Sequence, residues 1–168
     1  MKNNKVTSKK TDVKTTSATK KGISGITKST KNIQSGNYFL YKSHVENVGW
    51  TVYSSLGLTT GTTGQSKRLE ALRFTSNTFI DKFRAQAHVQ NKGWLPWIGY
   101  GDILGTVGEG RRLEAIRIDI PASYATNVRY RVHVENIGWM DYKTNNQIAG
   151  TTGRSLGIEA FEIHMDIV

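Results

Sequence analysis

The heptapeptide His88-Val-Gln-Asn-Lys-Gly-Trp94 occurs three times in this chain with small changes. The other copies are His44-Val-Glu-Asn-Val-Gly-Trp50 and His133-Val-Glu-Asn-Ile-Gly-Trp139. Their histidines are 44 and then 45 residues apart. A fixed period in this range is typical of a repeat architecture, so the fold has to be derived from one repeat taken three times.

Two further motifs follow each heptapeptide at fixed distances. Eleven residues after each tryptophan begins a turn bounded by glycines: Gly61-Thr-Thr-Gly64, Gly105-Thr-Val-Gly108 and Gly150-Thr-Thr-Gly153. Nine residues after the first glycine come a glutamate, an alanine and a large apolar residue: Glu70-Ala71-Leu72, Glu114-Ala115-Ile116 and Glu159-Ala160-Phe161. No insertion is needed within a copy, so the repeats cover about residues 38–76, 82–120 and 127–167.

Each repeat begins and ends with a strand pattern. Phe39, Tyr41 and Val45 alternate with Lys42 and His44, which predicts a half-buried strand whose histidine lies on the polar face. The closing strands are predicted at 68–75, 112–120 and 156–166. In their alternation the repeated glutamate falls on the same face as the apolar residues, so its side chain is expected to be partly buried. Between these strands we expect a short hairpin whose turn needs a positive φ, at Gly57, Gly101 and Asn146.

No stretch of the repeats has helical periodicity. Two long strands and a short hairpin, taken three times, amount to roughly twelve strands. One repeat cannot bury its apolar face alone, so the three repeats should close around a pseudo-threefold axis. The predicted fold is therefore all-β, a closed assembly of three four-stranded repeats that is β-prism-like, with a β-trefoil as the alternative.

The charge of the chain is concentrated at its start. Residues 1–36 contain nine lysines, one aspartate and no aromatic residue, whereas the other 132 residues have 14 basic against 12 acidic side chains. We interpret 1–36 as a disordered basic linker and 37–168 as a single domain. Lysines without interleaved aromatics argue against nucleic-acid binding. No stretch resembles a membrane span or a signal peptide, so we expect release by lysis or synthesis within a longer product.

The repeats resemble the clostridial hydrophobic-W (ChW) repeats of Gram-positive bacteria and their phages. The resemblance rests on Tyr130-x-Val-His-Val-Glu-Asn-Ile-Gly-Trp139, Ala149-Gly-Thr-Thr-Gly153 and Leu113-Glu-Ala-Ile-Arg-Ile118. Local departures are Ala85 for a tyrosine, Val107 for a threonine, and Gly157 where Arg68 and Arg112 stand. The resemblance implies a wall-binding module of the kind found in surface proteins and at the C-terminal end of cell-wall lytic enzymes.

Aromatic residues and asparagines in each repeat are the candidate ligand-binding residues. A flat aromatic face can cover the apolar face of a sugar ring, and a nearby amide can bind its hydroxyls. For the heptapeptide tryptophans we favour core packing over binding, while binding and packing are equally supported for the second aromatic, three residues later. The candidates are Trp50, Tyr53 and Asn47 in the first repeat, Trp94, Trp97 and Asn91 in the second, and Trp139, Tyr142 and Asn136 in the third.

The repeated histidines and glutamates suggest structural roles. A metal site of three histidines would need all three to point inward, and they fall on the polar face, so we expect no metal. For the glutamate we expect a carboxylate that caps backbone N–H groups of the glycine-bounded turn. Triplication argues against catalysis, because a hydrolase uses one acid/base pair in two different environments. No cofactor motif is present, and the absence of cysteine excludes disulfides and thiolate sites.

Triplication predicts a non-catalytic binding domain, and the resemblance implies that it anchors to the carbohydrate or peptidoglycan-associated polymers of Gram-positive walls. It would be the targeting part of a phage endolysin or autolysin, with a catalytic lysin chain as a partner. The alternative is a surface or assembly module that binds a protein. Three equivalent weak sites suit binding to a polymer, because linked sites raise the effective concentration.

Overall fold

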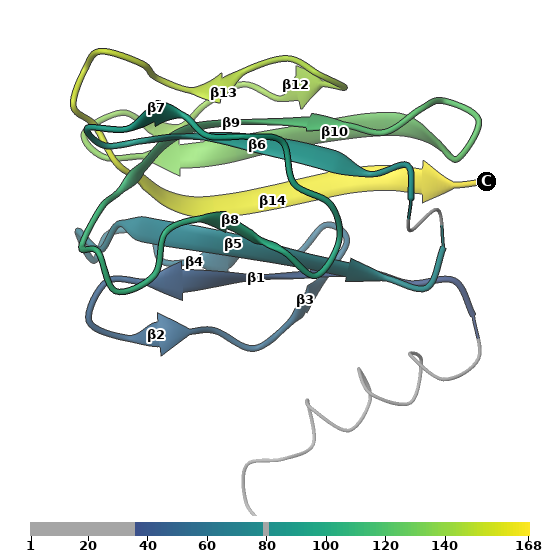
Figure 1. The fold of residues 1–168 in the computed structure, drawn as a ribbon, viewed down its shortest axis with the longest axis horizontal. Coiled ribbons are helices and arrows are strands. Elements are labelled where there is room, and N and C mark those ends of the chain that lie inside the picture. Colours follow the sequence, from purple (N-terminus) through teal and green to yellow (C-terminus); the bar gives the residue numbers. More distant parts are fainter. Residues whose placement is uncertain (1–35, 79–80) are drawn as a thin grey trace, which may run out of the picture. The chain divides into compact units, whose positions relative to one another are not determined.

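The computed structural model describes residues 36–78 and 81–168, and every regular element within them is a β-strand (Figure 1). The all-β prediction is confirmed. The predicted linker over 1–36 lies outside the described residues, except for Gly36. None of the described residues belongs to a helix that is long and apolar enough to cross a membrane.

Fourteen strands follow the order of the three repeats within the described residues. Repeat 1 contains β1 (Phe39–Val45), β2 (Gly49–Trp50), β3 (Ser54–Ser55), β4 (Thr60–Gly61) and β5 (Leu69–Ser76). Repeat 2 contains β6 (Arg84–Val89), β7 (Gly93–Trp94), β8 (Ile103–Gly105) and β9 (Leu113–Asp119). Repeat 3 contains β10 (Ala125–Val134), β11 (Gly138–Trp139), β12 (Lys143–Thr144), β13 (Ala149–Gly150) and β14 (Ile158–Ile167). The predicted long strands and hairpins are therefore present in each repeat.

The strands form three antiparallel sheets, and each sheet receives one strand from another repeat. The long pairs β1–β5, β6–β9 and β10–β14 each come from a single repeat and lie roughly parallel to one another in Figure 1. The exchanged strand β4 pairs with β14, β8 pairs with β5, and β13 pairs with β9. Each repeat gives one strand and receives one, so the exchange forms a cycle. None of the three sheets closes on itself.

Glycine makes the close approach of each exchanged strand sterically feasible. Gly61, Gly105 and Gly150 adopt φ values of 96°, 109° and 106°. At each of them a Cβ atom would lie 2.4 Å from the carbonyl oxygen of the repeated glutamate in the neighbouring repeat, so only glycine fits. The next residue donates its backbone N–H to that same oxygen: Thr62 to Glu159 at 2.9 Å, Thr106 to Glu70 at 3.0 Å, and Thr151 to Glu114 at 2.9 Å.

A β-bulge recurs in every long strand pair. His44 pairs with Ala71, but Val45 pairs with Leu69, so Glu70 is an additional residue on β5. The same register shift follows His88 and His133. Because side chains alternate with a period of two, the extra residue reverses the face to which the glutamate points. The prediction of a carboxylate that caps the turn is therefore wrong: the backbone carbonyl of the glutamate accepts the turn's N–H.

The inner faces of the three sheets share one hydrophobic core. Phe74 contacts Phe83 with ring centroids 5.0 Å apart, and Tyr41 contacts Phe161 at 5.3 Å, so aromatic side chains join the repeats. The buried hydroxyl of Tyr130 donates to the carbonyl of Gln147 and accepts from the N–H of Ile118 at 3.1 Å. Burial raises the pKa of Tyr130 to about 12, so this hydroxyl stays protonated and able to donate.

Ala85 replaces a tyrosine that is buried in the other two repeats, and the hairpin of repeat 2 contributes a different aromatic ring. Tyr41 and Tyr130 occupy the equivalent positions of the other repeats and are fully buried. In repeat 2, Tyr100 stacks on Phe83 with ring centroids 4.4 Å apart and an interplanar angle of 18°. An aromatic ring is thus supplied from another part of the same repeat.

Two neighbouring glycines test the importance of the close approach. Gly105→Ala should destabilise the protein by about 3 kcal/mol, the upper end of ordinary single substitutions, because its Cβ would meet the backbone of Glu70. Gly108→Ala is the matched control: its φ is 79°, but nothing lies within 4 Å of the added Cβ. This control should lose only about 1 kcal/mol, from the left-handed backbone. Urea unfolding of both variants measures the difference, and equal losses would contradict a role for the close approach.

Candidate functional site

The outer face of each sheet carries the residues that the sequence marks for binding. In repeat 1 they form an outer-face cluster of two aromatic residues, a cation between them and a histidine–glutamate pair. This cluster consists of Lys42, His44, Trp50, Tyr53 and Glu70. Repeat 2 repeats it with His88, Trp94, Trp97, Glu114 and Arg117. Repeat 3 repeats it with Arg131, His133, Trp139, Tyr142 and Glu159.

The histidine of each cluster lies within ion-pair distance of the glutamate of the β-bulge, and His88 also meets hydrogen-bond geometry with its partner. The distances from Nδ1 to Oε2 are 3.2 Å for His44–Glu70, 2.9 Å for His88–Glu114 and 3.0 Å for His133–Glu159. Each glutamate side chain is only 8% exposed, so the pair satisfies a carboxylate that would otherwise be costly to bury. The histidines lie on three separate sheets, and the described residues contain no group of three acidic or histidine side chains placed to hold a metal.

The tryptophan of each heptapeptide packs on this histidine at the surface. The ring centroids are 5.4, 5.5 and 5.6 Å apart in repeats 1, 2 and 3, and the rings are nearly perpendicular. All three tryptophans are half-buried and lie outside the hydrophobic core. The interpretation of Trp50, Trp94 and Trp139 as core residues is therefore wrong. The glycine before each tryptophan leads the chain into a short strand at the outer face instead of the inner one.

A single cation bridges the two aromatic residues of each cluster. The Lys42 ammonium lies 5.1 Å from the Trp50 ring centre and 4.7 Å from that of Tyr53. In the other two clusters a guanidinium has this position: Arg117 lies 5.3 Å from Trp94 and 4.7 Å from Trp97, and Arg131 lies 4.6 Å from both Trp139 and Tyr142. These distances are within the range of attractive cation–π contacts.

The bridging cation changes strands between repeats 2 and 3. Gln86 pairs in register with Arg117, and Arg131 pairs with Glu162, so the arginine stands on the closing strand in one repeat and on the opening strand in the other. In both cases its Nε donates to the oxygen of the cross-strand partner, at 2.8 Å to Gln86 and at 3.0 Å to Glu162. Our reading of the sequence missed these cations. These cations could have been found by comparing cross-strand pairs of residues between the repeats, because the pair contains an arginine in both repeats although the single positions differ.

A second cation lies beside each aromatic pair. Arg73 lies 5.6 Å from Trp50, Arg84 lies 5.1 Å from Trp97, and Arg129 lies 5.7 Å from Tyr142. Tyr53 and Tyr142 are 41% and 37% exposed, so solvent and ligands reach the second aromatic of these clusters. Each outer face therefore combines partly exposed aromatic surface with two cationic side chains, of which Arg84 is paired with Asp119 and Arg131 with Glu162.

The three candidate asparagines occupy turns between the first two strands of their repeats. Asn47, Asn91 and Asn136 are exposed and have φ values of 57°, 60° and 60°. Asparagine tolerates this left-handed conformation better than other residues with side chains, which explains its recurrence without any ligand. A role of these amides in binding stays a prediction. The predicted positive φ at Gly57, Gly101 and Asn146 is confirmed, at 80°, 80° and 63°.

A comparison with protein families agrees with this repeated geometry. The sequence model of the family described as "Clostridial hydrophobic W" matches residues 44–75, 88–121 and 133–166. The chain belongs to this ChW family. Each match begins at the histidine of the outer-face cluster and extends into the closing strand, so the ChW pattern contains the histidine, both aromatic residues and the glutamate.

ChW repeats are common in cell-wall-associated proteins. Neither the curated proteins nor the solved structures contain a match to this chain.

Glu162 anchors the bridging arginine of the third ChW repeat. Its Oε1 accepts hydrogen bonds from Arg131 Nε at 3.0 Å and from the Tyr142 hydroxyl, and it lies 3.2 Å from His164 Nε2. Thr59 of repeat 1 donates to Oε2 at 3.2 Å. Burial alone would raise the pKa of Glu162, but the hydrogen bonds from Tyr142, Arg131 and His164 outweigh burial and lower the pKa below its ordinary value of 4.5.

We expect Glu162→Gln to lower the free energy of unfolding by about 2 kcal/mol at pH 7, as hydrogen bonds to a charged group are lost. Because the pKa is lower in the folded state than in the unfolded state, the ionised carboxylate stabilises the fold above about pH 4.5. This stabilisation disappears as the pH falls through the folded-state pKa, so wild type and variant should converge in acid. Urea unfolding across this pH range measures the difference, and a constant difference would show that the carboxylate acts through packing alone.

Proposed function

We propose that the chain is a non-catalytic targeting domain that binds an anionic carbohydrate polymer of Gram-positive cell walls at its three outer-face clusters. The observation that carries this proposal is the cation held between two partly exposed aromatic rings, present once on each sheet. The association of ChW repeats with cell-wall proteins supports the same target.

The chemistry of a cluster suits a sugar that carries a phosphate or carboxylate group. A guanidinium stacked on an aromatic ring keeps its N–H groups in its own plane, parallel to the ring, where they can donate to an anion. Within the clusters, the hydrogen bonds of Arg117 and Arg131 use Nε, which leaves their terminal amino groups as donors. The exposed parts of the aromatic rings beside them offer apolar surface to the sugar ring. Teichoic acids are wall polymers with this combination of groups.

Triplication favours a polymeric ligand. A shallow surface site buries little area and binds weakly alone. A wall polymer that engages two or three clusters gains affinity through effective concentration without any new contact. The cyclic strand exchange supports a β-prism-like arrangement over a β-trefoil, since each cluster then has its own sheet. Such a domain would deliver a catalytic lysin chain to the wall, as part of an endolysin or autolysin.

Truncating the second aromatic residues tests the proposal. Tyr53→Ala, Trp97→Ala and Tyr142→Ala should each weaken binding of the full chain to purified walls, with Trp97→Ala having the largest effect because it removes the largest ring. The triple variant should lose wall binding in a pull-down, while its circular dichroism stays unchanged. Added salt should weaken wild-type binding as well, since the proposed contacts are partly electrostatic.

Two controls make the outcome interpretable. Tyr38→Ala changes an aromatic residue outside the three clusters and should bind walls as the wild type does. Walls from which teichoic acid has been removed separate an anionic polymer from peptidoglycan as the ligand. Normal wall binding by the triple variant would refute the assignment of the clusters.

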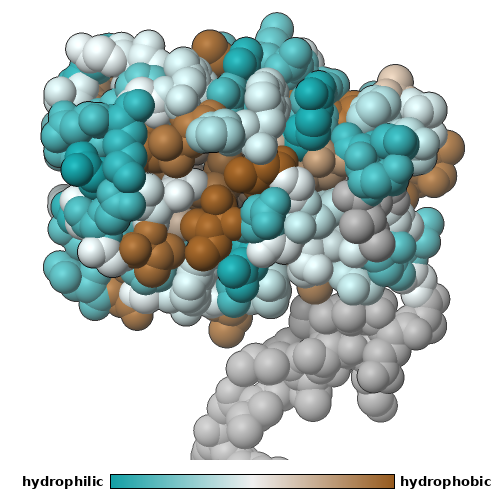
Figure 2. Space-filling view, viewed as in Figure 1, coloured by the Kyte–Doolittle hydropathy of each residue, from teal (hydrophilic) through white to brown (hydrophobic). Residues whose placement is uncertain are grey.

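Exposed aliphatic side chains in repeat 1 are the observation that favours a protein partner instead. Val48, Val52 and Leu58 are 57%, 81% and 57% exposed. Hydrophobic residues form small groups among polar ones on the face shown in Figure 2. Soluble wall fragments should displace the chain from walls if it binds their polymer, and should leave a complex with a protein partner intact.

A further inference from the structure

Arg68 of repeat 1 is held by three acceptors, two from its own repeat and one from repeat 2. Its guanidinium forms an ion pair with Glu46 and a second one, through NH2, with Glu70 Oε1 at 3.2 Å. NH2 also donates to the carbonyl oxygen of Gly110 at 3.2 Å, in the loop that leads from β8 to β9 of repeat 2. Two carboxylates and one backbone carbonyl thus surround one planar cation.

The equivalent position of repeat 3 is surrounded by the same three acceptors, but the arginine is missing there. Alignment of the repeats places Glu135 at the position of Glu46, Glu159 at that of Glu70, and Gly157 at that of Arg68. The third acceptor follows from the strand exchange. Just as β8 of repeat 2 pairs with repeat 1, β4 of repeat 1 pairs with repeat 3. The residue equivalent to Gly110 is therefore Ser66.

The loop conformation supports this equivalence. Ser66 and Gly110 both have a positive φ, of 50° and 63°. For serine this conformation is uncommon, so its presence shows that the two loops follow the same path despite their different residues. Ser66 therefore offers its carbonyl to repeat 3 as Gly110 offers its carbonyl to repeat 1.

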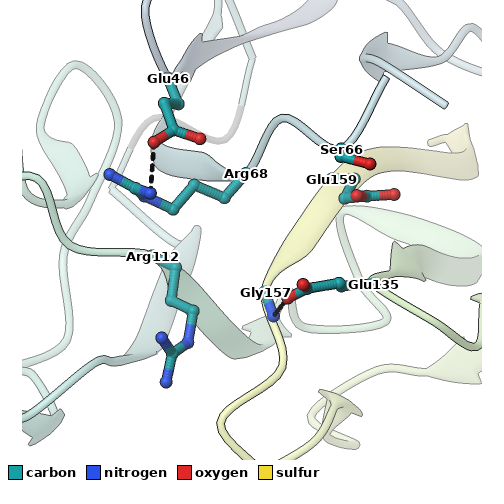
Figure 3. Close-up of a pocket in the computed structure, with 7 residues that line it drawn as sticks. All are labelled: Glu46, Ser66, Arg68, Arg112, Glu135, Gly157 and Glu159. Atoms are coloured by element: carbon teal, nitrogen blue, oxygen red, sulfur yellow. Dashed lines mark hydrogen bonds and ion pairs between the residues drawn. The ribbon is translucent and has the colours of Figure 1, made fainter. Parts of the chain in front are cut away.

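A cavity lies where the third arginine would be. It has a volume of about 190 Å³ and is lined by Glu46, Ser66, Arg68, Arg112, Glu135, Gly157 and Glu159 (Figure 3). This is well above the roughly 15 Å³ that a cavity needs to hold one water molecule. Gly157 leaves it open and also permits close packing, because a Cβ there would lie 3.3 Å from Arg68 Cβ and 3.4 Å from Arg112 Cδ.

The charges around the cavity favour a cation. Arg68 is paired with Glu46 and Glu70, and Arg112 donates to Glu114 Oε1 from Nε at 3.0 Å and from NH2 at 2.8 Å. The other two carboxylates of the cavity have no arginine. Glu135 accepts the backbone N–H of Gly157 at 3.3 Å, as Figure 3 shows. The side chain of Glu159 is 8% exposed, and His133 Nδ1 lies 3.0 Å from its Oε2. The equivalent Glu70 has both a histidine and an arginine beside it.

We infer that this cavity binds a guanidinium group supplied by another molecule, such as an arginine side chain of a partner or a small guanidino compound. The acceptors that hold a planar guanidinium in repeat 1 are repeated here, and the fixed fork of N–H donors of a guanidinium suits such a set better than a compact ammonium does. Residues 1–36 contain lysines but no arginine, so this segment does not supply the group. The inference is independent of the proposed wall binding.

Methylguanidinium is the probe that tests the site. We expect a titration of the full chain at constant ionic strength to shift the amide NMR signals of Gly157 and Ser66 with one saturable site per chain. Methylammonium, with the same charge, should bind at least about tenfold more weakly because it forms fewer charge-assisted hydrogen bonds. Equal binding of the two cations, or no saturable shift, would overturn the inference.

Glu135→Gln is the decisive variant. Repeat 2 carries Gln90 at the equivalent position, so the substitution is compatible with the fold of a repeat. It should weaken methylguanidinium binding at least about tenfold, as one charged acceptor is lost. Glu109→Gln is the matched control, since it removes the same charge from an exposed carboxylate that pairs with Lys92 and Arg111 outside the cavity. Equal affinities of the two variants would refute the site.

Two further variants fill the site or duplicate it. Gly157→Arg supplies a guanidinium from the chain itself and should abolish methylguanidinium binding. Arg68→Ala opens the equivalent site of repeat 1 and should increase the number of methylguanidinium sites from one to two. An unchanged number of sites in Arg68→Ala would show that the three acceptors do not suffice to bind the cation.

Discussion

The structure depends on one backbone contact between repeats, in which a turn N–H donates to the carbonyl of a bulged glutamate. The contact sets three features at once. It brings β4, β8 and β13 onto neighbouring sheets, it requires glycine at Gly61, Gly105 and Gly150, and it lies at the bulge that turns the glutamate outward. The carboxylate of the same glutamate then fixes the histidine on which the tryptophan packs. Assembly of the repeats and construction of the outer-face cluster are thus two consequences of the same residue.

The sequence was sufficient to predict what is local to one repeat. The all-β class, the long strands, the hairpin turns and the outward histidine follow from alternation and from residues that tolerate a positive φ. The strand exchange could not be predicted, because a short strand such as Thr60–Gly61 carries no pattern that identifies its partner strand. Parity also failed at Glu70, since one unpaired residue reverses its face relative to Leu72 and Phe74, which are buried as predicted.

Of the outer-face cluster, the sequence predicted the aromatic residues as binding candidates but not the cation between them. Trp50 and Tyr53 are prominent in the sequence, but the cation between them depends on cross-strand register. Arg117 and Arg131 occupy opposite strands, and alignment of the repeats places Arg117 at Glu162 and Arg131 at Gln86, so a position-by-position comparison treats them as unrelated. Gly157 is a departure visible in the sequence, but only the folded structure shows that the acceptors of an arginine are retained around it.

The cyclic exchange of strands also restricts how the number of repeats can change in evolution. A chain with two ChW repeats of this kind would have to reconnect its donor strands, or would expose an unpaired sheet edge that invites association with other chains. Loss or gain of a single repeat would therefore break the cycle of exchanged strands within such a domain. Functional divergence must proceed by substitution inside a fixed set of three, and the three repeats can specialise while the fold is retained. Gly157, which interrupts an otherwise repeated arginine, is a substitution of this kind.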